Sequence, residues 1–184
     1  HGASEIRVAQ TETERALFWK GRKAAFASVG RISPNYIVQD GVIPRTALPE
    51  ILDEIAVLGK ASGLRVANVF HAGDGNLHPL VMYDRRIAGQ EQAAEALSLR
   101  ILELCIEKGG SITGEHGVGE EKKYMLAKMF AEPDLDTMQR VRCAFDPLLL
   151  ANPTKIFPRP RLCGEKPGEY VPHPLETAGV AERF

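Results

Sequence analysis

Two histidines flank an Asp-Gly pair in the segment His71-Ala-Gly-Asp-Gly-Asn-Leu-His78. Asp-Gly between extended, apolar-alternating segments favours a two-residue type I′ hairpin turn, because both central residues need a positive φ. A turn at Asp74 and Gly75 would place His71 directly opposite His78, with Cβ atoms roughly 4.5–5.5 Å apart. Two imidazoles so placed can share a divalent metal. The alternative is a pair of hydrogen-bonded polar side chains with no ligand.

A glycine-rich segment later in the chain, Gly110-Ser-Ile-Thr-Gly-Glu-His-Gly-Val-Gly119, carries a carboxylate and an imidazole side by side. Glycines leave the backbone free to approach a ligand closely. The segment has neither the Gly-Lys-Ser/Thr ending of a P-loop nor the G-x-G-x-x-G spacing of a dinucleotide site. A flexible connector is the alternative interpretation.

Together the two segments offer a complete set of chemical groups. His71, His78 and Glu115 make a two-imidazole, one-carboxylate set suited to Zn²⁺, Mn²⁺ or Fe²⁺. His116, next to the carboxylate, can serve as a general base.

Two other features are weaker when taken alone. Asn152-Pro-Thr-Lys-Ile-Phe-Pro158 predicts a stiff strap, because a following proline restricts Asn152 and Phe157 to extended geometry. It would present an amide and the Lys155 ammonium outwards, although a surface tail is the default interpretation. Arg22 lies in a helical pattern, where an exposed arginine is normally only a solvated charge.

Composition indicates an ordinary globular domain. The chain has 184 residues, 44% hydrophobic and 26% charged, with a net charge of −1. No basic patch favours nucleic acid, and no apolar run approaches the roughly 20 residues of a membrane span. No signal-peptide pattern is present. The start, His1-Gly-Ala-Ser, has no initiator methionine, so we expect a fragment of a longer protein.

The three cysteines, Cys105, Cys143 and Cys163, are odd in number and widely spaced, with no C-x-x-C motif. The pattern predicts reduced thiols in a cytoplasmic compartment and gives no support for a cysteine-ligated iron–sulfur cluster.

Hydrophobic periodicity and turn signals predict the elements that position these groups. The expected helices are 12–28, 48–61, 90–108, 120–130 and 135–145, and the expected strands are 36–39, 65–71, 76–83 and 111–113. In the predicted hairpin one face carries Ala67, Val69, His71, His78, Leu80 and Met82. Pro79 lacks an N–H, so we expect it at an edge-like or bulged position.

This order of elements indicates an α+β fold, with an antiparallel sheet and helices packed on one face in the ferredoxin-like manner. C-terminal helices follow within a first unit, residues 1–150. Residues 151–184 are rich in proline and have little periodic apolar content, so we expect an irregular tail that lies on a larger surface.

Three segments together resemble one family: 70–79 (FHAGDGNLHP), 109–119 (GGSITGEHGVG) and 144–155, with Ala-Phe-Asp-Pro and Asn-Pro-Thr-Lys. They are similar to the C-terminal half of FAD-linked 2-hydroxy-acid dehydrogenases of the vanillyl-alcohol oxidase type, most nearly to its bacterial glycolate-oxidising members. The resemblance runs from about residue 15 to the end. It implies a cap, or substrate, domain whose FAD is held mainly by an N-terminal domain that this chain lacks. The tail 151–184 would pack on that domain.

By matching motif, the resemblance implies that His71, His78 and Glu115 are metal ligands. It implies that His116 accepts the α-hydroxyl proton while hydride leaves for the flavin, and that Arg22 clamps the substrate carboxylate with its guanidinium fork.

The resemblance also places Glu115, Asn152 and Lys155 near the flavin. Relatives that take larger diacids tend to have polar or basic residues at positions that are apolar here, which are Phe26, Val38 and Leu80. This difference favours glycolate or D-lactate over 2-hydroxyglutarate as the substrate.

The family's glycolate enzymes work with flavin-like and iron–sulfur partner subunits. We therefore expect a cytoplasmic protein, held at the inner face of the membrane only through such partners, whose isolated C-terminal piece is inactive. Two other functions stay open on the residues alone. One is a stand-alone metal-binding module, and the other is a metal-dependent hydrolase with Glu115 or His116 as its base.

Overall fold

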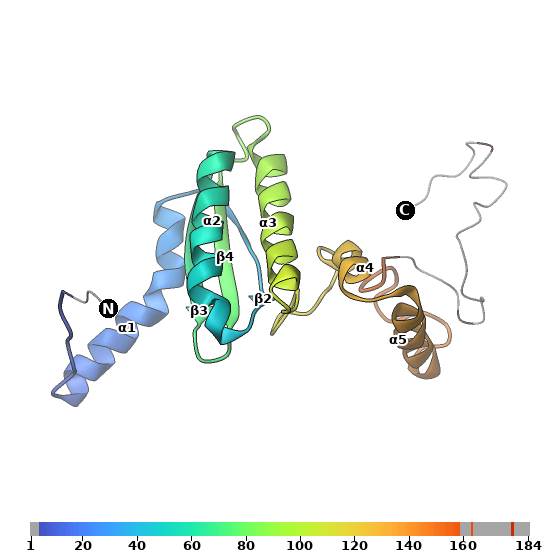
Figure 1. The fold of residues 1–184 in the computed structure, drawn as a ribbon, viewed down its shortest axis with the longest axis horizontal. Helices are drawn as coiled ribbons and strands as arrows, with labels where there is room; N and C mark the ends of the chain where they lie inside the picture. Colours follow the sequence, from blue (N-terminus) through green and yellow to red (C-terminus); the bar gives the residue numbers. More distant parts are fainter. Residues whose placement is uncertain (1–3, 159–162, 164–177, 179–184) are drawn as a thin grey trace.

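A computed structural model describes residues 4–158, 163 and 178 (Figure 1). Five α-helices are described: α1 (Glu12–Ser28), α2 (Leu48–Ser62), α3 (Gln90–Glu107), α4 (Leu126–Met129) and α5 (Glu132–Phe145). The strands are β1 (Asn35–Val38), β2 (Gly41–Val42), β3 (Arg65–His71) and β4 (Asn76–Tyr83). The arrangement is the expected α+β fold, an antiparallel sheet with helices packed against it.

The central strand of the sheet is β4. Along one side it pairs with β3, and along the other side with β1 and β2 in succession. The partners of β1 and β2 follow one continuous register, from Asn35 opposite Tyr83 to Val42 opposite Asn76. Residues 39 and 40 therefore lie opposite 79 and 78. The expected strand 111–113 is reduced to a single bridge between Ser111 and Val42.

The predicted hairpin register was wrong by two residues. His71 lies opposite Asn76, and His78 lies opposite Val69. The turn spans four residues, and the N–H groups of Asp74 and Gly75 both donate to the His71 carbonyl. The reason is tertiary: the Gly75 carbonyl accepts the N–H of Ile43, which draws Gly75 into the ladder. A shift of two residues keeps every side chain on its predicted face, because side chains alternate with a period of two.

Pro79 lies in the central strand β4, opposite Asn68 of β3, and its other side faces the break between β1 and β2 at residues 39 and 40, which fits the edge-like position expected for it. Its carbonyl accepts the N–H of Gln39. In an antiparallel ladder the N–H and C=O of one residue point to the same side. The missing N–H of Pro79 therefore removes one hydrogen bond toward Gln39. It removes no hydrogen bond toward β3.

The two faces of the sheet are covered differently. The helical face, which carries Leu77, Val81 and Tyr83 of β4, is covered by α2 and α3, whose Ile55 and Ile101 belong to the same core cluster (Figure 1). The histidine face carries His71 and His78. It also carries an apolar cluster that packs beneath the end of α1, formed by Phe26, Val29, Tyr36, Val38, Ala67, Val69, Leu80 and Met82.

Beyond the sheet the chain forms a smaller cluster around Ile112, Leu126 and Leu135, where α4 and α5 approach α3. The expected helix 120–130 is shorter and broken, a 3-10 turn at Lys123–Met125 followed by α4. Residues 151–158 of the tail contain no helix or strand, and the rest of the tail, apart from 163 and 178, lies outside the described residues.

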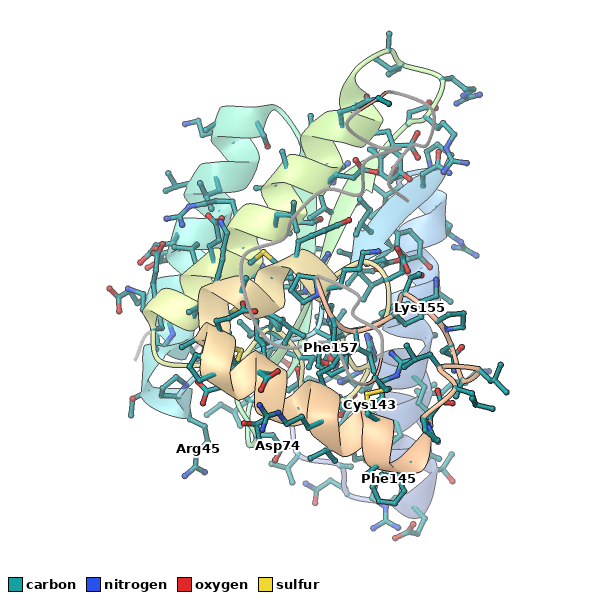
Figure 2. The ribbon with its side chains drawn as sticks, turned by 90° about the vertical axis from the view of Figure 1, so that its right-hand side faces the viewer. Arg45, Asp74, Cys143, Phe145, Lys155 and Phe157 are labelled. Atoms are coloured by element: carbon teal, nitrogen blue, oxygen red, sulfur yellow. A yellow bond between two sulfur atoms is a disulfide. The ribbon has the colours of Figure 1, made fainter. Side chains whose placement is uncertain are left out.

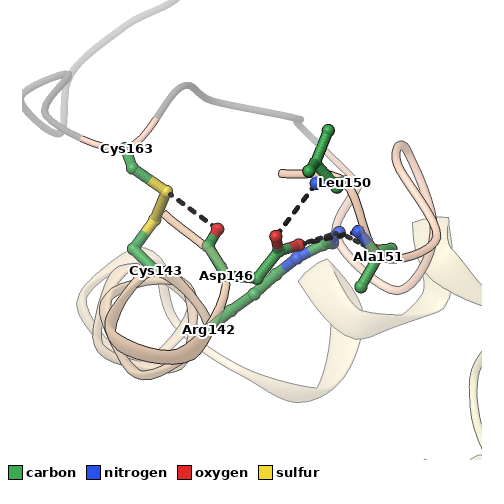
Figure 3. Close-up of a disulfide and its surroundings, with 6 residues drawn as sticks. All are labelled: Arg142, Cys143, Asp146, Leu150, Ala151 and Cys163. Carbon is green, nitrogen blue, oxygen red and sulfur yellow. Dashed lines mark hydrogen bonds and ion pairs between the residues drawn. A yellow bond between two sulfur atoms is a disulfide. The ribbon is translucent and has the colours of Figure 1, made fainter. Parts of the chain in front are cut away.

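The prediction of three reduced thiols was wrong, since Cys143 of α5 and Cys163 form a disulfide (Figure 3). The chain reverses after α5, and this brings together two cysteines 20 residues apart in sequence. Asp146 stabilises the reversal, because its carboxylate accepts the N–H groups of Leu150 and Ala151. Cys105 is a free, buried thiol.

Candidate active site

His78 is fixed in the middle of the histidine face. It lies in β4 and is only 6% exposed. Its Nδ1 is 3.3 Å from the Gln39 carbonyl oxygen, and its Nε2 is 3.5 Å from Oε2 of Glu115. An Nδ1–H that donates to a backbone carbonyl leaves the Nε2 lone pair free, which is the usual arrangement of a metal-ligating histidine.

Pro79 explains why that carbonyl is available. Gln39 and Pro79 lie opposite each other, and only one of the two ladder hydrogen bonds can form, from Gln39 N–H to Pro79 O. The Gln39 carbonyl therefore has no strand partner at this point, and the imidazole of His78, the residue before Pro79, reaches it. The gap in the ladder between β1 and β2 thus orients His78.

Glu115 brings the two predicted histidine ligands together. Its Oε1 is 3.8 Å from Nε2 of His71, and its Oε2 is 3.5 Å from Nε2 of His78. The two imidazole rings meet edge to face, with centroids 5.4 Å apart. The structure therefore brings the three predicted ligands together. The Glu115 carboxylate of the loop joins the two histidines, which are not directly opposite each other on the two strands.

His116 lies against the His78 ring. The two rings are stacked, with centroids 5.1 Å apart and an interplanar angle of 18°. His116 is exposed, whereas His78 is buried. The residue predicted to be the base is thus next to the predicted ligands and open to an incoming molecule.

Asp40 is a member of this site that the sequence analysis missed. It lies between β1 and β2, is fully buried, and accepts hydrogen bonds from the Thr113 hydroxyl and from the N–H groups of Gly114, Glu115 and His116. Burial alone would raise the pKa of Asp40, but these hydrogen bonds outweigh it and hold the pKa well below its ordinary value. The Asp40-Gly41 pair reads as a simple turn signal, so no sequence pattern singled it out.

The site gathers several atoms of the kinds that bind divalent transition metals. One such atom from each of Asp40, His78, Glu115 and His116 lies within 4.8 Å of the others, and the predicted ligand His71 is not among these four. Imidazole and carboxylate are the ligands that Zn²⁺, Mn²⁺ and Fe²⁺ share. Beside them the Asn76 Oδ1 is buried and has no hydrogen-bond partner among the described residues, which leaves an acceptor for a bound ligand.

The remaining predicted site residues lie farther out. Arg22 is exposed on α1, one helical turn before Phe26, which packs on the histidine face. The Lys155 ammonium lies at the surface, where its Nζ is 2.7 Å from Oε2 of Glu120 and both side chains are more than 40% exposed (Figure 2). The extended geometry predicted for Asn152 was wrong, because its φ is 45° in a tight reversal whose carbonyls accept hydrogen bonds from Arg142.

The three apolar positions that the sequence analysis linked to substrate choice lie together. Phe26, Val38 and Leu80 belong to the apolar cluster of the histidine face, and Leu80 is two residues from His78 on the same side of β4. The site is therefore bordered by an apolar wall.

Among the described residues no helix is long and apolar enough to cross a membrane.

Comparison with known proteins gives a consistent family. The profile of "FAD linked oxidases, C-terminal domain" matches residues 1–156.

Curated relatives cover nearly the whole chain. Glycolate oxidase subunit GlcD of Escherichia coli K12 is 51% identical over 183 residues, all of this chain and 37% of the relative. GlcD of Bacillus subtilis is 35% identical over 84% of this chain and 33% of its own length. The mitochondrial D-lactate dehydrogenase [cytochrome] of Arabidopsis thaliana is 32% identical over 89% of this chain and 29% of its own length. The chain thus spans about a third of the length of these relatives.

Proposed function

Because the chain belongs to the FAD linked oxidases, whose C-terminal domain it matches, we propose that it forms the substrate half of a flavin-dependent oxidoreductase. The substrate is a small 2-hydroxy acid, glycolate or D-lactate, which is oxidised to the 2-oxo acid. One observation carries the proposal: Glu115 lies between two imidazoles, with a third imidazole, His116, stacked beside them.

His71, His78 and Glu115 hold the divalent metal in this proposal. A metal there supplies Lewis acidity, which lowers the pKa of a bound hydroxyl group. His116 then needs only modest basicity to take the α-hydroxyl proton on one of its ring nitrogens. His78, held by the Gln39 carbonyl, keeps its Nε2 directed at the site.

Arg22 binds the substrate carboxylate, a bidentate task that suits a guanidinium. Its position one turn before Phe26 supports this, since Phe26 reaches the same face of the sheet as His78. Phe26, Val38 and Leu80 favour a small substrate, because they offer no hydrogen-bonding partner to a second carboxylate. The names of the relatives, glycolate oxidase and D-lactate dehydrogenase, agree with substrates of this size.

FAD, which a preceding domain would mainly hold, would supply the redox chemistry as the hydride acceptor. Asn152 and Lys155, with Glu115, approach the flavin, and the tail 151–184 packs on that domain. The electrons leave through flavin-like and iron–sulfur partner subunits, in a cytoplasmic assembly at the inner face of the membrane.

The decisive experiment uses the longer protein that contains both the flavin domain and this chain. We expect His78→Ala to lower turnover of glycolate and D-lactate at least a hundredfold while the flavin absorption spectrum is unchanged, because the flavin contacts lie elsewhere. Asn68→Ala, an exposed change on the neighbouring strand β3, is the control and should keep normal activity.

Near-normal turnover in His78→Ala would remove His78 from the metal site. Absence of bound flavin in the longer protein would contradict the oxidoreductase proposal and favour a metal-binding module. The present chain alone should not turn over glycolate.

A further inference from the structure

The glycine-rich loop that carries Glu115 and His116 is held to the sheet by one buried carboxylate. A single oxygen of Asp40, Oδ2, lies 2.7 Å from the Thr113 hydroxyl, 3.0 Å from the N–H nitrogens of Gly114 and Glu115, and 2.8 Å from that of His116. These donors are consecutive along the loop, so the loop wraps around this oxygen.

We propose that Asp40 is a positioning residue, not a metal ligand, and that it sets the place of Glu115 and His116 relative to His78. The inference rests on the proposed function for the roles of those three residues. In this inference Asp40 holds Glu115 and His116 at the positions relative to His78 that their joint function requires.

The hydrogen bonds argue against direct coordination by Asp40. Metal binding at Oδ2 would displace the N–H groups that hold the loop, and each would then be left without its partner. The other oxygen, Oδ1, lies 3.2 Å from the Glu115 nitrogen and 3.9 Å from Nδ1 of His78, on the side of the ring that faces Gln39. His78 directs its other nitrogen, Nε2, toward Glu115.

Asp40 can serve as an anchor because its own backbone is fixed. The preceding residue, Gln39, bonds to Pro79, and the following residue, Gly41, pairs with Leu77. Gly41 also lies tight against α3, since a Cβ there would be 2.5 Å from the Cys105 sulfur. The carboxylate therefore has a defined position relative to the central strand β4, which carries His78.

The loop needs such an anchor. Gly117 and Gly119 adopt positive φ values of 79° and 57°, and glycine backbones lose more freedom on ordering than other residues. A ligand and a base on so free a segment would sample many positions without external hydrogen bonds. The bonds to an ionised carboxylate are stronger than bonds between neutral groups.

Lys122 supplies the compensating charge. Its Nζ lies 3.7 Å from Asp40 Oδ2, is buried, and has no hydrogen-bond partner among the described residues. A buried carboxylate without a nearby cation would be strongly disfavoured. Asp40 thus faces the loop amides and hydroxyl, His78 and Lys122, which together suit a permanent anion.

The test uses Asp40→Asn in the present chain, with Asp53→Asn on the exposed surface of α2 as the matched control. Asparagine keeps the shape but loses the charge and one acceptor. We expect Zn²⁺ and Mn²⁺ affinity, measured by calorimetry, to fall about 10–100-fold, as for other residues that orient metal ligands. The control should keep the affinity of the unmodified chain.

Two further readouts separate positioning from ligation. Amide hydrogen exchange at Gly114, Glu115 and His116 should accelerate in Asp40→Asn without metal, and should stay slow in His78→Ala. The absorption spectrum of bound Co²⁺ at saturation should be the same in Asp40→Asn as in the unmodified chain, because the ligands are unchanged. An altered Co²⁺ spectrum would make Asp40 a ligand, and unchanged loop exchange would remove it as the anchor.

If Asp40→Asn does not fold, Thr113→Val provides the milder change, because it removes one of the same hydrogen bonds. We expect faster exchange at the loop amides in a chain that keeps its helical circular dichroism, and unchanged exchange would overturn the proposal. If the unmodified chain binds no metal, the proposed metal role fails, while the exchange measurement still decides whether Asp40 holds the loop.

Discussion

The side chains of β4 are buried by different means on the two faces of the sheet. On the helical face, Leu77 and Val81 pack against apolar side chains of α2 and α3. On the histidine face, His78 of the same strand is buried beside Asp40 and a loop of backbone amides. Apolar packing is not directional, whereas buried polar groups must find matching partners. The helical face should therefore determine stability, and the histidine face should determine function.

The largest effect should come from the helical face. Ile55 of α2 is fully buried in the main core cluster, so Ile55→Ala removes apolar contacts and leaves a cavity. We expect the free energy of unfolding, from denaturant titration, to fall by about 2–5 kcal/mol. Metal affinity of the folded molecules should be unchanged.

Val57→Ala on the same helix is the control, because Val57 is 67% exposed and should change stability by less than about 0.5 kcal/mol. A large loss of metal affinity in folded Ile55→Ala would contradict the separation of the two faces.

The faces themselves could be predicted from the sequence, because alternation along 65–71 and 76–83 depends only on the period of a strand. The alternation was robust even to a register error of two residues. The three candidate ligands His71, His78 and Glu115 could be named from the sequence for a similar reason, since their residue types and flanking glycines are local signals.

Asp40, the disulfide and the conformation of Asn152 could not be found in this way. The role of Asp40 depends on donors more than 70 residues away in sequence, at Thr113 to His116. The Cys143–Cys163 bridge depends on a reversal after α5 that Asp146 and Arg142 stabilise through backbone groups. Such contacts arise from the tertiary fold and leave no periodic pattern.

A smaller effect should follow from Pro79→Ala, which restores the N–H that the ladder lacks. The Gln39 carbonyl could then accept the strand N–H as well as His78 Nδ1, because it has two lone pairs. We expect Zn²⁺ affinity to weaken by up to about tenfold, the lower end of effects on ligand orientation, with little change in melting temperature. Nitrogen-15 NMR of the His78 ring should show more of the tautomer with the proton on Nε2.

Pro49→Ala in the first turn of α2 is the control for loss of a proline, since it lies on the helix that covers the opposite face. Tighter Zn²⁺ binding by Pro79→Ala, or an unchanged tautomer ratio, would show that the gap in the ladder does not orient His78.

The smallest effect concerns the thiol at the boundary of the helical face, Cys105 of α3. Burial raises the pKa of Cys105 to about 12, although the Lys122 ammonium opposes the shift, so almost no thiolate forms at pH 8. A thiol reagent at pH 8 should therefore find no reactive group in the folded chain, one in unfolded chain without reductant, and three after reduction, because Cys143 and Cys163 are bridged. Rapid labelling of one thiol in the folded chain would mean that α3 separates readily from the sheet near Gly41. The helical face would then be accessible to solvent at a place where the structure has it buried. In that case stability and function would not be divided between the two faces.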